Sequence, residues 1–182
     1  MGDTTMHGLR SEMTKVGNPY KNGVFGRESY YTSVSFTIQD TVLDVTAKVD
    51  TGATYTIFGL NNSMFSELAE QIQNSTMRGR AYDASDTELR LYGYVVNDFR
   101  LTDDIVIDRI KLFFSADIGD KALLGMDILS LFDFQYLREK HQNYGTFWIN
   151  NYHEVLKELH TRKLNKGIDY IDPILIANIE PR

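Results

Sequence analysis

Two consecutive stretches of the chain alternate between hydrophobic and polar residues with the period of a β-strand. Hydrophobic residues occupy every second position in 33–39 and again in 43–49, as expected for strands with one buried face. Asp40-Thr41 between them is a candidate turn, so the two stretches predict a β-hairpin. The second strand of this hairpin leads directly to Asp50.

Strand patterns continue through most of the chain as far as residue 150, and helical spacing is confined to short segments. Further strands are expected at 54–58, from 77 to 96 on both sides of a polar stretch at 83–87, and at 105–107, 110–114 and 122–125. Phe134 and Tyr136 are expected to pair with Phe147 and Ile149. Short helices are expected near 62–72 and 126–132.

The end of the chain has a different pattern. Residues 152–164 fit an amphipathic helix that stops at Gly167. Residues 168–179 are apolar and contain Pro173, which suits an edge strand or a docking tail. We therefore expect a mostly β chain in three parts: an N-terminal arm (1–28) without clear periodicity, a β domain (29–151), and a C-terminal helix and tail (152–182).

Composition removes several classes of function. The 182 residues carry 19 Lys and Arg against 25 Asp and Glu, a net charge of −6, which argues against a nucleic-acid binder. Cysteine is absent, so disulfides and thiolate chemistry are excluded. His153 and His160 lack the spacing and the third ligand of a zinc site, and we predict neither a metal nor a cofactor. With no apolar run of membrane-spanning length and no apolar leader, the prediction is a cytoplasmic protein without a membrane partner.

The candidate chemistry lies in Val49-Asp50-Thr51-Gly52-Ala53. A tight turn after an apolar strand can lift the Asp50 carboxylate out of the sheet and hold it rigidly. Gly52 allows another backbone or a substrate to approach closely, and Thr51 offers a hydroxyl that can tie the turn to a neighbouring chain. The Asp-Thr-Gly triplet alone is a weak signal, but Leu123-Leu124-Gly125 and a short helix follow downstream.

This pair of motifs resembles that of the retropepsins, the retroviral-type aspartic proteases. The likeness covers about residues 30–137 and includes a flap-type hairpin around 77–96. It implies a closed β-barrel equal to one lobe of an acid protease, with short helices and the C-terminal helix as an extension. It also implies that Asp50 is catalytic, that Thr51, Gly52 and Ala53 support the active-site turn, and that Leu124 and Gly125 support that turn from below.

The triplet occurs once, whereas two-lobed acid proteases carry it twice in one chain. The resemblance therefore implies a homodimer in which two Asp50 carboxylates share one proton and activate a water that attacks a peptide bond. Asp127 lies in the downstream helix motif and is not a second copy. Ala53 stands where a hydroxyl residue sometimes follows the triplet, from which we expect optimal activity at mildly acidic to neutral pH.

In the resemblance, the flap covers the bound peptide and is expected to contribute four substrate-binding residues: Tyr82, Asp83, Ala84 and Ser85. The acids at its tip either attract basic substrate residues or are simply solvated. Other hypotheses also remain open. The chain is an aspartic endopeptidase, a catalytically inactive dimer of the same fold that binds an extended peptide or protein partner, or a protease that becomes active only after its tail is removed or a partner engages it. The tail itself forms a dimer sheet, packs on its own domain, or covers the substrate groove.

Overall fold

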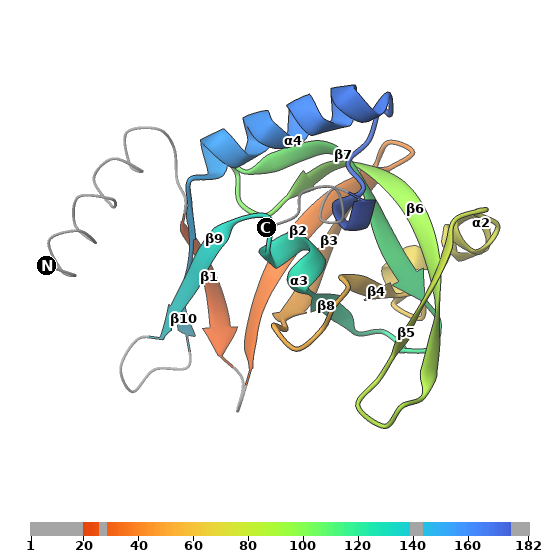
Figure 1. Ribbon diagram of the computed structural model, residues 1–182. Helices are drawn as coiled ribbons and strands as arrows, with labels where there is room; N and C mark the ends of the chain where they lie inside the picture. The colour runs from red at the N-terminus through yellow and green to blue at the C-terminus, as the bar shows by residue number, and fades with distance from the viewer. Residues whose placement is uncertain (1–19, 26–28, 139–143, 176–182) are drawn as a thin grey trace, which may run out of the picture.

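The computed structural model describes residues 20–25, 29–138 and 144–175, and ten strands in this part of the chain form one continuous sheet (Figure 1). The strands are β1 (Tyr20–Phe25), β2 (Tyr30–Ile38), β3 (Thr41–Val49), β4 (Ile57–Gly59), β5 (Arg78–Tyr82), β6 (Glu88–Arg100), β7 (Val106–Ser115), β8 (Ala122–Leu124), β9 (Asp133–Arg138) and β10 (Tyr144–Asn150). The helical elements are a 3-10 turn, η1 (Ser63–Phe65), and the helices α2 (Ala69–Gln73), α3 (Met126–Leu129) and α4 (Tyr152–Lys166).

Six strands of the sheet close into a barrel. Their order is β6-β7-β4-β8-β3-β2, and β2 returns to β6 through pairs such as Thr37 with Asn97. The remaining strands extend the sheet at its ends: β1, β10 and β9 continue from β2, and β5 pairs with β6. The expected mostly β architecture with a closed barrel, short helices and a C-terminal helix is confirmed.

The β2–β3 hairpin forms as its alternation predicts, with Val34 opposite Val45 and the alternating hydrophobic residues of 34–38 and 43–49 buried. The turn lies one residue earlier than expected. Gln39 and Asp40 occupy it with φ values of 47° and 65°, the left-handed geometry that two-residue hairpins favour. Inside the barrel, the ring of Phe36 lies 5.0 Å from that of Phe58 and 6.1 Å from that of Phe114.

Other boundaries differ from those predicted. The expected helix over 62–72 divides into η1 and α2, which bury only Phe65 and Ile72. A segment this short does not sustain a continuous helix on its own. The two strands expected at 105–107 and 110–114 are one strand, β7, because the charged Asp108 lies on an exposed face and does not interrupt the pairing with β6.

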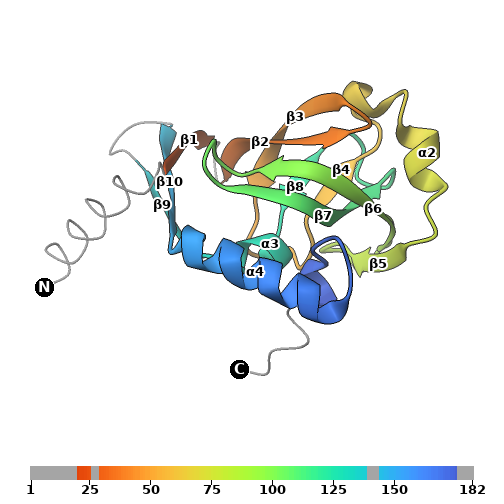
Figure 2. The ribbon, with the colours of Figure 1, turned by 90° about the horizontal axis from the view of Figure 1, so that it is seen from above.

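The C-terminal elements pack on the outside of the barrel. Helix α4 runs across the side that contains β7 (Figures 1 and 2) and buries Tyr152 and Leu159. It ends at Gly167, which adopts a φ of 69° and donates its N–H to the carbonyl of Leu164, as expected of a glycine stop. The expected pairing of Phe134 with Ile149 and of Tyr136 with Phe147 is present between β9 and β10.

No helix in the described ranges is both long enough and apolar enough to cross a bilayer.

Candidate active site

Asp50 is the first residue after β3 and begins a turn that the backbone holds on both sides. Its N–H donates to the Leu124 carbonyl at 2.9 Å, which ties the turn to β8. The Ala53 N–H donates to the Asp50 carbonyl at 3.1 Å and closes the turn. The Gly52 N–H donates to Asp50 Oδ1 at 3.0 Å, while the side chain stays 27% exposed. The result is a fixed carboxylate that solvent or a ligand can reach.

The loop after Asp50 rests directly on the start of α3. The N–H of Met126 donates to the Ala53 carbonyl at 2.8 Å, and that of Asp127 donates to the Thr54 carbonyl at 3.0 Å. Gly125 makes this approach possible, since a Cβ there would lie 2.5 Å from the Tyr55 carbonyl oxygen. The downstream Gly motif of the sequence therefore packs against the Asp50 loop.

A buried polar pair completes the connection between this loop and α3. Thr56 Oγ1 accepts the Gly125 N–H at 3.0 Å and donates to the Asp127 carboxylate, which also accepts the Ile128 N–H. Burial raises the pKa of Asp127 above its ordinary value, although the hydrogen bonds from Thr56 and Ile128 act in the opposite direction. Asp127 is thus a structural carboxylate beneath the Asp50 loop.

A groove of about 830 Å³ opens in front of the Asp50 turn. The turn forms one side of the groove, and the β5–β6 hairpin forms the other. Most of its surface is apolar. The lining residues are Asp50, Gly52, Ala53, Thr54, Tyr55, Ile57, Arg80, Ala81, Tyr82, Asp83, Ala84, Leu89, Ile118 and Leu123. The Asp50 carboxylate and residues of the β5–β6 hairpin therefore line the same groove.

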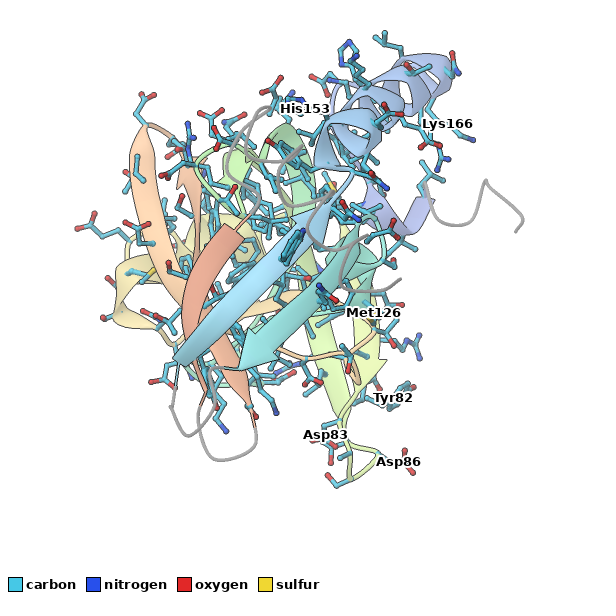
Figure 3. The ribbon with its side chains drawn as sticks, turned by 90° about the vertical axis from the view of Figure 1, so that its left-hand side faces the viewer. Tyr82, Asp83, Asp86, Met126, His153 and Lys166 are labelled. Atoms are coloured by element: carbon cyan, nitrogen blue, oxygen red, sulfur yellow. The ribbon has the colours of Figure 1, made fainter. Side chains whose placement is uncertain are left out.

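The tip of the hairpin, where Tyr82, Asp83 and Asp86 are labelled, projects from the body of the molecule (Figure 3). Asp83 Oδ1 accepts hydrogen bonds from the Ser85 hydroxyl at 2.7 Å, the Ser85 N–H at 2.9 Å and the Thr87 N–H at 3.0 Å. These bonds, that from the Ser85 hydroxyl above all, lower the pKa of Asp83. The Asp83 carboxylate therefore accepts its hydrogen bonds from within the hairpin tip, whereas Tyr82 is 58% exposed.

One cation lies close to the Asp50 carboxylate. Lys48 Nζ, two residues earlier on β3, is 3.9 Å from Asp50 Oδ2, and its side chain is 39% exposed. An ion pair this exposed contributes little to stability, about 0–1 kcal/mol. The ion pair matters because Lys48 places a positive charge beside Asp50, and not because it stabilises the fold.

The structure brings most of the predicted site residues to the groove. Those that line it are Asp50, Gly52, Ala53, Tyr82, Asp83 and Ala84. Thr51 is exposed and Ser85 bonds to Asp83, and neither lines the groove. Sequence reasoning missed the apolar lining residues Tyr55, Ile57, Leu89, Ile118 and Leu123, because they belong to separate elements and share no local pattern.

Among the residues that the structure describes, no group of three or more acidic or histidine side chains is placed to bind a metal ion.

Comparisons with known proteins give a likeness to solved structures but none to a family model or a curated sequence. No protein-family model matches the chain, and no curated protein matches its sequence. A solved structure that resembles it is a retropepsin-like aspartic protease from Rickettsia conorii, with 16% sequence identity and a TM-score of 0.49. The likeness covers 71% of this chain and 99% of that one.

Proposed function

We propose that the chain is an aspartic endopeptidase that works as a homodimer, with the Asp50 side chains of two copies forming the catalytic pair. The observation that carries this proposal is the Asp50 turn. Its carboxylate is held by a backbone hydrogen bond, remains partly exposed, and lines a groove that the β5–β6 hairpin also lines. A rigidly held carboxylate in a groove that can bind a peptide is what activation of a water for attack on that peptide requires.

The need for a second copy follows from the acids in the groove. Of the residues that line it, only Asp50 and Asp83 carry carboxylates, and Asp83 is engaged by its own hairpin tip. Within the described residues, one subunit therefore supplies the groove with one carboxylate that its own hairpin tip does not engage, whereas proton sharing needs two. A two-fold axis that brings the Asp50 turns of two copies together would supply the pair.

The chemistry of such a pair uses two carboxyl groups and one water. One carboxylate is ionised and takes a proton from a water, whose oxygen attacks the carbonyl carbon of the peptide. The protonated carboxyl donates a hydrogen bond to the carbonyl oxygen and stabilises its developing charge. The tetrahedral intermediate then loses its C–N bond as a proton passes to the leaving nitrogen, which yields one carboxylate and one amine.

The groove suits an extended peptide. Among the strands that the structure describes, β5 is the terminal one and pairs with β6 alone, so its other edge faces no described strand and offers backbone groups that a peptide strand could pair with. The apolar lining residues can contact the peptide's side chains. We extend the proposal to a cytoplasmic protein whose partners are its own second copy and a peptide or protein substrate.

The test compares wild type with Asp50→Asn, which keeps the shape of the side chain and removes its ionisable group. Asp44→Asn, at an exposed position of β3, is the matched control. We expect wild type and Asp44→Asn to cleave members of a peptide library between pH 4 and 8, and Asp50→Asn to lose about 1,000-fold or more in kcat/KM. Sedimentation equilibrium should show dimers for all three proteins. Cleavage by Asp50→Asn at the wild-type rate, or cleavage by a monomer, would contradict the proposal.

A specific observation supports a second candidate, a catalytically inactive dimer that binds an extended peptide. Lys48 balances the Asp50 charge within one subunit, so the carboxylate has a charge partner without a second copy. Peptide binding that is unaccompanied by cleavage in wild type and in Asp50→Asn would favour this candidate over the enzyme.

A further inference from the structure

Residues 168–175, the C-terminal segment, lie against the edge of β7 that β6 leaves open. The Lys111 N–H donates to the Ile171 carbonyl, and the Ile171 N–H donates to the Arg109 carbonyl, both at 2.8 Å. The pairing is parallel, like that of β4 with residues 113–115 on the same edge. The C-terminal segment and β4 therefore lie one after the other along the same edge of β7, and the segment runs toward β4.

An ion pair with little exposure anchors the C-terminal segment at this position. Lys111 Nζ lies 2.8 Å from Asp172 Oδ2, and both side chains are 14% exposed. Asp172 Oδ1 accepts the N–H groups of Ile174 and Leu175 at 3.2 and 3.3 Å, which sets the direction of the chain after Pro173. Removing one partner would leave a largely buried charge without compensation, so the pair resists opening.

The anchored segment places Ile174 in a small apolar cluster that is separate from the main core. Ile57, Leu89, Leu91 and Phe113 are the buried members of this cluster. Ile174 packs against them together with Tyr55, Ala81 and Ile118. Five members also line the groove, and we call them the groove wall: Tyr55, Ile57, Ala81, Leu89 and Ile118. Ile174 packs against the same buried cluster but is absent from the groove lining.

We propose that the C-terminal segment is a positioning element of the peptide groove, in which Ile174 seats the groove wall and the Lys111–Asp172 pair holds Ile174 in place. The proposal rests on the proposed function in so far as the groove binds peptide. None of residues 168–175 lines the groove, so this segment does not block access to Asp50. Its loss should therefore weaken peptide binding, which is opposite to the effect of releasing an inhibitory tail.

The test uses the full-length chain and the variants Ile174→Ala and Ile174→Val. Leu164→Ala, which truncates a 62% exposed leucine on α4, is the matched control. Two readouts are taken: hydrogen exchange of amides in β5 and in residues 55–57, and KM and kcat for a cleaved peptide. Ile174→Ala should speed exchange at these amides but not in β2 or β3, and raise KM about tenfold with little change in kcat, because the groove wall loses its support. Ile174→Val, which keeps most of the side chain, should show exchange rates and a KM close to those of wild type.

Asp172→Asn is a second route to the same result, for use if Ile174→Ala does not fold. It removes the charge partner of Lys111 and keeps an oxygen that can accept the Ile174 N–H, so we expect the same changes at smaller size. Wild-type exchange at the groove wall in these variants, or a rise in kcat/KM, would overturn the proposal. Hydrogen exchange needs no substrate. If wild type cleaves no peptide, the proposed activity is refuted, but the exchange rates of the variants still decide whether Ile174 supports the groove wall.

Discussion

Thr56 donates two hydrogen bonds to one oxygen of Asp127, from its backbone N–H at 2.9 Å and from its hydroxyl at 2.7 Å. The two residues are 71 positions apart in the chain. Thr56 is fully buried just before β4, and Asp127 stands in the first turn of α3. This pair therefore locks the loop after Asp50 onto the helix beneath it.

Asp127→Asn should make stability less sensitive to pH. Burial raises the pKa of Asp127 in the folded state above its unfolded value of about 4. The folded state thus holds the proton more tightly, and the resulting stability is fully present below about pH 4 and lost as pH rises through the folded pKa. Asparagine accepts the same hydrogen bonds without titrating. Urea unfolding at fixed protein concentration should show the variant gaining on wild type as pH rises from 4 to 7; a constant difference would contradict this.

Asp127→Ala tests the same site in the other direction. It removes the acceptor of the Thr56 and Ile128 donors and leaves them buried, which should cost about 1–3 kcal/mol of unfolding free energy at every pH. The comparison separates the loss of hydrogen bonds from the loss of charge. An alanine variant as stable as wild type at pH 7 would show that the pair does not hold the loop.

Gly125→Ala should damage both the fold and the site. The new Cβ would lie 2.5 Å from the Tyr55 carbonyl oxygen and 2.9 Å from that of Ala53, so the Asp50 loop must move away from α3. We expect a loss of about 2–3 kcal/mol in unfolding free energy and a severe loss of activity. Gly167→Ala is the control. It faces open space at a φ of 69°, and should cost about 1 kcal/mol without affecting the site.

Asp83→Ala should loosen the tip of the β5–β6 hairpin. The variant lacks the acceptor for the amides of Ser85 and Thr87, so their hydrogen exchange should accelerate while global stability stays unchanged. Because the pKa of Asp83 is lowered, these bonds persist from neutral pH down to the lowered value and are lost as pH falls through it. Asp86→Asn removes a charge from the same tip and should leave exchange at wild-type rates. Faster exchange in both variants would indicate an effect of charge alone.

Ala53→Ser tests the expected pH dependence of cleavage. Ala53 lines the groove beside Asp50, and a serine hydroxyl in this turn could donate to the carboxylate and favour its ionised form at lower pH. Wild type should be most active at mildly acidic to neutral pH, and the variant's optimum should move to lower pH. Ala84→Ser, on the opposite side of the groove, should leave the profile in place. A wild-type optimum at about pH 3 would rule out this reading of Ala53.

Features that depend on neighbours in sequence could be predicted from the residues alone. The alternation in 33–39 and 43–49 determines the β2–β3 hairpin because every second side chain reaches the same face. Gly167 ends α4 because it adopts a left-handed backbone at little cost. β1 could not be predicted in this way, since Tyr20–Phe25 shows no periodicity and becomes a strand by pairing with β10.

The candidate site likewise combines features that depend on neighbouring residues with features that depend on distant contacts. The amino-acid order alone determined that Asp50 follows an apolar strand on a glycine-containing turn, since those residues are adjacent. Only the tertiary structure decided that the turn faces the β5–β6 hairpin across a groove, that Thr56 reaches Asp127, and that Ile174 packs against the buried cluster of Ile57, Leu89, Leu91 and Phe113. Each of these contacts joins residues that are far apart in the chain and that only the packing of the folded chain brings together.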